Sequence, residues 1–281
     1  MLTTCRTWPN LSTSDALLRD ELAARGHEVH ACPWNDADVE RFVDADAIVL
    51  RSNWDYHHDI DRFGAWLDQL ERAGANVINP LGLVRWSLTK EYLSDLRISG
   101  LPVPELCRFS RADSADLLDW AAGRDRFVIK PLIGASGHDV RLVHEADVEA
   151  MLAALADDDR DHIAQRFVTD IGGGEWALVF FAGQFHYAYQ RVPAPGEFRV
   201  NSQYGGSLQP GVPSPALVAL GTDALERLPG DAVYARVDVI DTVDGPALME
   251  VEVNEPALGL HLHPTAPLRF ADVILDAAAV T

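Results

Sequence analysis

Hydrophobic and polar residues in the first 85 positions alternate between short apolar runs and stretches with the spacing of a helix. The clearest stretch is 60–73, where large apolar side chains fall at i, i+3, i+4 and i+7 and Gly74 follows. This spacing predicts an amphipathic helix that ends at Gly74. Because strands alternate with helices, we predict a small parallel α/β domain over residues 1–85. Its other expected elements are a helix over 16–25 and strands over 29–32, 47–50 and 77–80.

Beyond residue 86 the pattern changes to strands joined by short turns. The runs 127–131 and 139–144 flank a loop of small residues, which predicts a β-hairpin. From Glu175 onward, β-type runs separated by single glycines or by Asp-Gly predict an antiparallel sheet. The other expected elements are strands over 162–168, 175–182, 184–192, 198–202, 233–241 and 247–254, and helices over 87–99, 113–122, 147–156, 215–228 and 268–279.

Composition narrows the class of protein. The chain has 281 residues, 48% of them hydrophobic, so we expect a sizeable folded core. Its 43 acidic and 23 basic residues give a net charge of -20, which repels phosphate backbones and argues against nucleic-acid binding. We find no apolar run typical of a membrane helix or a signal peptide. The three cysteines form no disulfide or metal pattern, which fits a cytoplasmic protein.

The chain contains only two lysines, Lys90 and Lys130. Lys130 ends an apolar run, and the loop Gly134-Ala135-Ser136-Gly137 follows shortly after it. Such a loop lets the backbone approach phosphate oxygens, and a lysine beside it offers a compact positive charge. A polyphosphate site is therefore one interpretation of this segment. The alternatives are that the loop is a plain hairpin turn and that the two lysines occur here by chance.

Carboxylates alternate with valines along the run 247–254. Since strand side chains alternate between faces, Glu250, Glu252 and Asn254 share one face. If the partner strand turns Asp238 toward them, oxygen ligands gather there, and Mg²⁺ would relieve the repulsion between the carboxylates. We therefore predict a Mg²⁺ site formed by Asp238, Glu252 and Asn254. The alternative is an exposed acidic face on a hairpin.

Two pairs of histidines are less decisive. His261 and His263 lie on one side of an extended segment, but no third ligand has zinc spacing, so a pocket rim or plain surface is favoured. His57 and His58 follow an aromatic cluster at a strand end, where substrate recognition and a simple capping loop stay open. No Ser-His-Asp or Cys-His arrangement is evident, so no side-chain nucleophile is expected.

The order of these motifs resembles the ATP-grasp superfamily, most closely its glutathione-synthetase-like branch. The resemblance covers residues 79–280 and rests on Lys90, Lys130, the small-residue loop, the runs 165–168 and 198–201, Asp238 and the run 252–254. The segment 51–56 is similar to a smaller group that includes D-cycloserine-forming ligase. The resemblance implies an ATP-grasp fold, α/β and α+β, with a small lobe at 86–168 and a large lobe at 169–281 after the N-terminal domain.

The resemblance also implies roles for individual residues. ATP would be bound between the lobes by Lys90, Lys130, Gly134, Ser136, Gly137, Gln165, Phe167, Val168 and Glu175, and Mg²⁺ by the predicted oxygen ligands. Arg199 and Lys130 would act on the transferred phosphate. The substrate would meet Arg51, Trp54, Tyr56, Tyr204, Gly205 and Gly206, and backbone N–H groups of that last loop would hold an oxyanion. The run Glu175-Trp176-Ala177 departs from the family because it lacks the arginine that many relatives carry two residues after the acid.

The expected activity is an ATP- and Mg²⁺-dependent ligation of a carboxylate to an amine through an acyl phosphate. The substrate would be small and amino-acid-like, and the reaction either joins two molecules or closes a ring, as in D-cycloserine formation. A small-molecule kinase and a catalytically silent nucleotide-binding module are the rivals. The identities of the acid and the amine, and assembly into a homo-oligomer, stay open.

Overall fold

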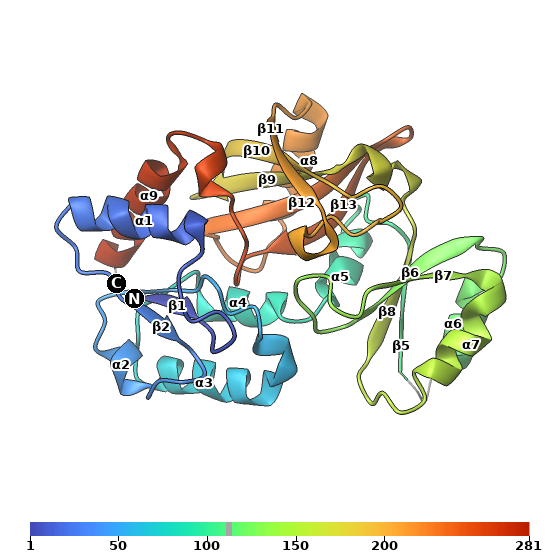
Figure 1. Ribbon diagram of the computed structural model, residues 1–281, viewed down its shortest axis with the longest axis horizontal. Helices are drawn as coiled ribbons and strands as arrows, with labels where there is room; N and C mark the ends of the chain where they lie inside the picture. Colours follow the sequence, from blue (N-terminus) through green and yellow to red (C-terminus); the bar gives the residue numbers. More distant parts are fainter. Residues whose placement is uncertain (111–113, 281) are drawn as a thin grey trace.

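The computed structural model describes residues 1–110 and 114–280 and contains three sheets (Figure 1). The first is parallel, in the order β2-β1-β3-β4. Its strands are β1 (Leu2–Thr4), β2 (Ala31–Pro33), β3 (Ile48–Val49) and β4 (Val77–Ile78), and its helices are α1 (Thr13–Ala24), α2 (Glu40–Val43) and α3 (Ile60–Arg72). The expected parallel α/β arrangement is confirmed, and α3 buries its apolar stripe as predicted. Strand β1 was not predicted, because two of its three buried residues are threonines.

Two short helices, α4 (Leu81–Ser87) and α5 (Tyr92–Ile98), stand where one helix was expected over 87–99. That prediction is wrong, and Lys90 lies in the turn between them. The sequence gives little sign of the break, since Leu88 to Glu91 contains neither proline nor glycine. The backbone N–H of Lys90 donates to the carbonyl of Leu132 at 2.9 Å. This bond connects the turn to the start of the loop that follows residues 127–131.

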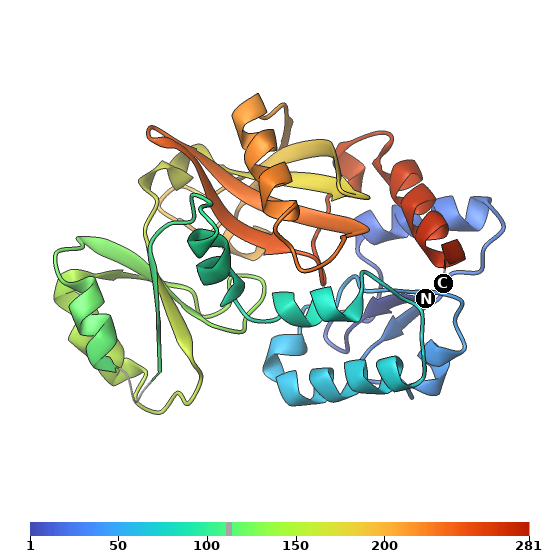
Figure 2. The same cartoon turned by 180° about the vertical axis from the view of Figure 1, so that it is seen from behind.

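The second sheet is antiparallel, in the order β5-β8-β6-β7. It consists of β5 (Leu106–Phe109), β6 (Arg126–Pro131), β7 (Arg141–His144) and β8 (His162–Arg166). Helices α6 (Ser114–Ala121) and α7 (Val148–Ala154) cover one side of it (Figures 1 and 2). The predicted hairpin is confirmed as β6 and β7. Asp113, the expected start of α6, lies outside the described residues.

The third sheet is antiparallel and has the order β11-β10-β9-β12-β13. Its strands are β9 (Glu175–Phe181), β10 (Gln184–Val192), β11 (Ser207–Gly211), β12 (Tyr234–Thr242) and β13 (Gly245–Glu252).

The strand expected over 198–202 is wrong. Residues 198–201 are irregular, and β11 takes the edge of the sheet after the 3-10 turn Ser202–Tyr204. The chain reverses at Gly205, whose φ is +82°. A Cβ atom at Gly206 would lie 2.1 Å from the carbonyl oxygen of Val200, so only glycine allows the two backbones to approach this closely.

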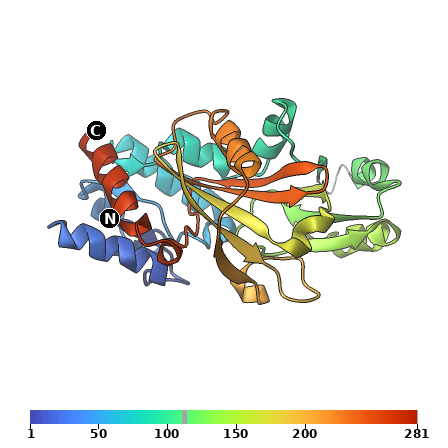
Figure 3. The same cartoon turned by 90° about the horizontal axis from the view of Figure 1, so that it is seen from above.

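The last helix packs on the first part of the chain. Helix α8 (Pro215–Leu225) contacts the large sheet at β12, β13 and β10, whereas α9 (Ala266–Val280) lies beside α1 (Figures 1 and 3). One buried cluster joins Leu18 of α1, Phe270 of α9 and Phe181 of β9. The N-terminal sheet and the large sheet therefore share a core. None of the described helices is long and apolar enough to cross a membrane.

Asn79 fastens the N-terminal part to the large sheet through its side chain. It is fully buried and has a φ of 67°, a backbone region that asparagine tolerates better than most residues. Its Nδ2 donates to the carbonyls of Tyr234 at 2.9 Å and Val253 at 2.7 Å, and its Oδ1 accepts from the backbone N–H of Val233 at 2.7 Å. One amide thus bridges strand β12 and the chain after β13.

Candidate active site

A cavity of about 1320 Å³ lies between the large sheet, the β6–β7 hairpin and loops of the N-terminal sheet. Most predicted site residues line it: Lys90, Lys130, Gly134, Ser136, Gly137, Gln165, Phe167, Val168, Glu175, Arg199, Glu252, Asn254, Arg51, Trp54 and Tyr56. Four predicted residues are not among its lining: Asp238, Tyr204, Gly205 and Gly206.

Both lysines reach this cavity, in different electrostatic settings. The ammonium group of Lys90 pairs with Glu250, which outweighs the burial that opposes its charge and raises its pKa. Lys130 donates to Oε1 of Gln165 at 3.0 Å and forms no ion pair with a described carboxylate. Burial and the charge of Lys90 lower the pKa of Lys130 to about 8. Lys130 is therefore a buried cation suited to an anionic ligand.

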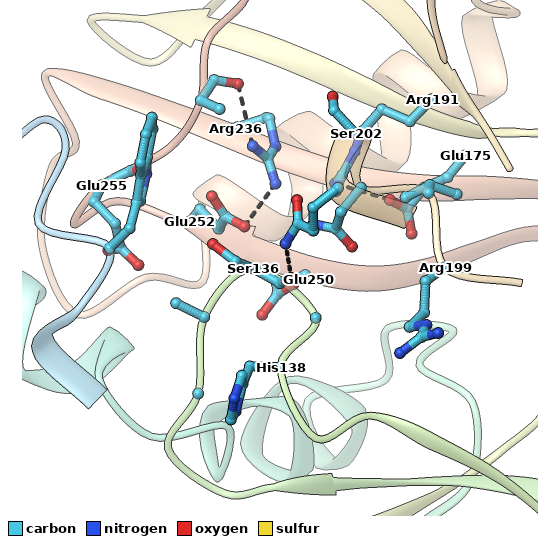
Figure 4. A pocket seen from close by; sticks show the side chains of 18 of the residues that line it. Ser136, His138, Glu175, Arg191, Arg199, Ser202, Arg236, Glu250, Glu252 and Glu255 are labelled. Atoms are coloured by element: carbon cyan, nitrogen blue, oxygen red, sulfur yellow. Dashed lines mark hydrogen bonds and ion pairs between the residues drawn. The ribbon is translucent and has the colours of Figure 1, made fainter. Parts of the chain in front are cut away.

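The loop between β6 and β7 is docked on the segment that follows β10. Ser136 and Gly137 have positive φ values of 56° and 69°. The amide of Gln203 donates to the carbonyl of Ser136, and the hydroxyl of Tyr204 donates to that of Gly137 at 3.1 Å. The small-residue loop thus lines the cavity, and in Figure 4 His138 lies on this loop below the carboxylates.

One end of the cavity is largely apolar. Phe167 and Val168, together with Val128, Ile240 and Met249, line it. The Nε2 atom of Gln165 is buried there without a hydrogen-bond partner. A flat heteroaromatic ring with acceptor atoms would satisfy both features.

The strand pairing brings three carboxylates together. Asp238 of β12 is paired with Glu250 of β13, and Arg236 with Glu252, so all four side chains occupy one face. Oxygen atoms of Asp238, Glu250 and Glu252 lie within 4.8 Å of one another. The expectation that Asp238 faces the same side as the glutamates is confirmed, and Glu250 belongs to the group as well.

Two arginines that sequence reasoning missed neutralise this group (Figure 4). Arg236 donates to Asp238 at 2.8 Å and to Glu252 at 2.6 Å, and Arg191 donates to Asp238 at 2.8 Å and to Glu175 at 3.0 Å. Asp238 is consequently 1% exposed and does not line the cavity. Arg191 stands directly opposite Glu175 on the neighbouring strand, so the structure supplies a cation where Glu175-Trp176-Ala177 lacked one. The alternation of Arg236 with Asp238 was the available signal for a shared face.

The carboxylates titrate differently because their surroundings differ. Lys90 and Lys130 outweigh burial at Glu250 and lower its pKa to about 2. Burial raises the pKa of Glu252 to about 7 and that of Glu175 to about 8. At Glu255, burial and the nearby charge of Glu252 raise the pKa to about 8. When all five carboxylates (Asp238, Glu250, Glu252, Glu175 and Glu255) are ionised they outnumber the two lysines and two arginines beside them, so a bound cation would favour their ionised forms.

The buried side chain of Asn254 indicates that a Mg²⁺ ion fits beside the carboxylates. Its side chain is 3% exposed, and neither Oδ1 nor Nδ2 has a hydrogen-bond partner. An unpartnered buried amide is costly unless a ligand satisfies it. Hard oxygen donors on Glu250, Glu252, Asp238 and Asn254 suit Mg²⁺. Because Arg191 and Arg236 occupy the Asp238 carboxylate in this structure, Glu250, Glu252 and Asn254 are the residues that would hold the ion, which would supply charge neutralisation at phosphate oxygens.

Arg199 and the loop after it differ from expectation. The guanidinium of Arg199 pairs with Glu197 at 2.7 Å and lies 3.6 Å over the ring of Tyr204. In Figure 4 it stands apart from the Arg236–Glu252 pair. The backbone N–H groups of Tyr204, Gly205 and Gly206 already donate within their own turn. In this structure these donors are occupied, and the oxyanion site expected there stays a prediction.

The three substrate residues predicted in the N-terminal part adjoin the cavity. Arg51 is 1% exposed; its Nε donates to Asp15 and its Nη2 to the carbonyl of Pro256, each at 2.8 Å. Trp54 donates from Nε1 to the carbonyl of Glu255 at 3.2 Å. Arg51 and Trp54 thus hold the chain that follows β13 in place.

The two pairs of histidines lie in different parts of the structure. His57 and His58 pack against His138 of the loop, with ring centroids 5.8 and 5.5 Å from it. His261 lines the cavity, whereas His263 contacts His186 with centroids 5.2 Å apart. Among the described residues, no histidine joins a group of three potential metal ligands.

Comparison with known proteins accounts for this arrangement. Residues 1–79 match the family model of the D-cycloserine synthetase DcsG N-terminal domain, and residues 108–261 match that of the prokaryotic glutathione synthetase ATP-grasp domain. The chain belongs to the ATP-grasp family. Its members to which this chain is similar are ATP-dependent ligases that form C–N bonds, and it is an enzyme of that kind.

Individual relatives extend over most of the chain. The cycloserine biosynthesis protein DcsG of Streptomyces lavendulae is 31% identical over 277 residues, covering 89% of each chain. A glutathione synthetase of Nitrosomonas europaea is 27% identical over 239 residues, covering 83% of this chain and 71% of the relative. The crystal structure of D-cycloserine synthetase DcsG superimposes with a TM-score of 0.86 at 25% identity, covering 99% and 98% of the two chains. D-alanine–D-alanine ligase of Bacillus anthracis shares the ATP-grasp fold, with a TM-score of 0.73 at 17% identity over 99% and 96% of the chains.

Proposed function

We propose that this ligase activates a small, amino-acid-like carboxylate as an acyl phosphate and joins it to an amine. The observation that supports this most is the convergence of both lysines of the chain on one cavity beside the Glu250–Glu252 cluster. Lys130 and Lys90 bind the triphosphate of ATP, and the 134–137 loop covers it and excludes water. The apolar end around Phe167 and Val168 takes the adenine ring.

The reaction has two steps. A carboxylate oxygen of the substrate attacks the γ-phosphorus of ATP; an O–P bond forms and ADP leaves. The amine nitrogen then attacks the carbonyl carbon, a C–N bond forms, phosphate leaves, and the nitrogen loses a proton to solvent. Arg199 serves the transferred phosphate after leaving its ion pair with Glu197.

Ring closure within one molecule is the form of the reaction that we favour. The N-terminal segment 1–79 matches the DcsG N-terminal domain, and the cycloserine biosynthesis protein covers 89% of the chain. That segment supplies Trp54 and Tyr56 to the cavity wall. The carboxylate and the amine then belong to one substrate, as in D-cycloserine formation.

The products test this proposal. Purified protein with ATP and Mg²⁺ is screened against amino acids and aminooxy or dipeptide precursors, alone and with separate amines, and ADP and phosphate are measured. A ligase releases both in equal amounts, and a cyclising ligase does so with one substrate alone. ADP without phosphate, together with a stable phosphorylated product, would make the enzyme a kinase. Lys130→Met is the inactive control.

A further inference from the structure

Glu255 is a buried carboxylate that lines the cavity without a cation of its own. Glu255 is 9% exposed, and no described side chain forms a hydrogen bond or an ion pair with its carboxylate. Its neighbours differ: Glu250 pairs with Lys90, Glu252 with Arg236, and Glu175 with Arg191. A carboxylate so far removed from water is costly unless a positive group meets it.

Glu255 lies at the side of the carboxylate cluster that adjoins the N-terminal part, although the charge of Lys90 still reaches it. Figure 4 shows it on the opposite side of Glu252 from Glu175 and Arg191. Trp54 fixes its carbonyl oxygen, and Arg51 fixes the carbonyl of the next residue, Pro256. The backbone on both sides of the carboxylate is thus held by the N-terminal part of the chain.

Aromatic side chains surround the same end of the cavity. Trp8 and Trp54 both line it and meet edge to face, with centroids 5.8 Å apart. Trp8 is 59% exposed, which is unusual for so large an apolar side chain. Tyr56 also lines the cavity and lies close enough to Glu255 to sense its charge. A carboxylate next to aromatic faces is the combination that binds organic ammonium groups.

Arg51 does not convert this end into an anion site. Its guanidinium pairs with Asp15 at 2.8 Å, and its remaining Nη1 atom is shut off from solvent. Resting on the proposed function, we propose that Glu255, with Trp54 and Trp8, binds an ammonium group of the substrate. The acid that the enzyme activates is accordingly an amino acid with a free ammonium group, whose far end is anchored at the N-terminal part.

Binding without turnover tests this assignment. In the presence of the ATP analogue AMP-PNP and Mg²⁺, calorimetry compares D- and L-serine with glycerate, and D- and L-alanine with lactate. Each pair differs in one ammonium group. We expect the wild type to bind at least one amino acid about tenfold more tightly than its hydroxy acid. Glu255→Gln should abolish that preference, and Trp8→Leu should reduce it.

The controls distinguish the outcomes. AMP-PNP with Mg²⁺ should bind Glu255→Gln within about twofold of the wild type, and Glu149→Gln, an exposed change on α7, should leave both affinities unaltered. A preference that persists in Glu255→Gln, or equal or absent binding of both acids by the wild type, overturns the proposal. Weakened AMP-PNP binding with an intact ammonium preference would assign Glu255 to the metal site instead. Because ATP is not consumed, failure here differs from a failure to release ADP and phosphate.

Discussion

At the scale of single residues, the two lysines differ in the groups that their ammonium groups contact. Lys90 is neutralised by Glu250, whereas the ammonium group of Lys130 is hydrogen-bonded, within the described part of the chain, to the neutral amide of Gln165 alone. A phosphate would supply Lys130 with the anion that it lacks. The free enzyme holds the proton of Lys130 weakly, with a pKa of about 8, and the nucleotide complex should hold it more strongly.

Nucleotide affinity should therefore fall as the pH rises past 8. Below that pH Lys130 is charged before binding; above it, binding must take up a proton, so each further unit costs up to about tenfold in affinity. Lys130→Met should bind AMP-PNP about 10- to 100-fold more weakly at pH 7 and lose most of this pH dependence. Titrations of both proteins with AMP-PNP at pH values between about 6.5 and 9.5 measure this pH dependence. A flat wild-type profile would contradict the role of Lys130.

Asn254 should show opposite effects on stability and function. Its unpartnered buried amide costs free energy in the empty protein, so Asn254→Leu should leave the free energy of unfolding unchanged or raise it by about 1 kcal/mol. The same change should abolish Mg²⁺-dependent release of ADP. Denaturant unfolding and a Mg²⁺ titration measure the two effects, and Asn254→Asp, which keeps an oxygen, should retain part of the activity. Full activity in Asn254→Leu would remove this residue from the metal site.

At the scale of elements, the β6–β7 loop and the segment 198–206 act as a pair. The hydrogen bonds from Gln203 and Tyr204 to this loop depend on the turn that Gly205 and Gly206 allow. The expected strand over 198–202 failed at this point, because close approach of two backbones is not visible in hydrophobic periodicity.

Gly206→Ala should disturb both stability and nucleotide binding. The added methyl group would collide with the carbonyl of Val200, and relief requires the backbone to shift. We expect a loss of about 1–3 kcal/mol in the free energy of unfolding and weaker AMP-PNP binding, because the 134–137 loop loses its support. Gly172→Ala, where a methyl group meets nothing within 4 Å, is the matched control. Equal behaviour of the two variants would refute the coupling.

The elements that could be predicted were those with a complete pattern. Helix α3 and the strands β6, β7, β9 and β10 show clear periodicity or turn residues. The face shared by Glu250 and Glu252 followed from alternation alone. Arg191 and Arg236 could not be foreseen as partners of Asp238, because the order of strands in the sheet brings Arg191 there. Asp238 itself was placed in the correct cluster but is screened from the cavity by these same arginines.

At the scale of the whole molecule, the shared core makes the N-terminal sheet and the large sheet interdependent. The division at residues 85 and 168 remains our proposal for the units of the chain, yet Asn79 and the α1–α9 contact cross the first boundary. We expect unfolding of the N-terminal part to involve the large sheet.

Asn79→Ala tests this coupling. It removes the bridging hydrogen bonds and leaves buried carbonyl and N–H groups unpaired, at a cost of about 3 kcal/mol or more in the free energy of unfolding. Asn79→Gly keeps a residue that accepts the positive φ, so the difference between the two variants isolates backbone strain. Denaturant unfolding followed by tryptophan fluorescence and by circular dichroism should give coincident transitions in the wild type. Separate transitions would show independent units.

The packing of α9 against α1 bears on how the protein is made. A ribosome delivers residues 1–85 well before residues 266–280, which form the helix that completes their core. The N-terminal sheet therefore waits, with apolar surface uncovered, until α9 has been made. Since α9 packs beside α1, a linker from the end of α9 to residue 1, with new ends opened in an exposed turn, should yield a permuted enzyme that needs no such delay.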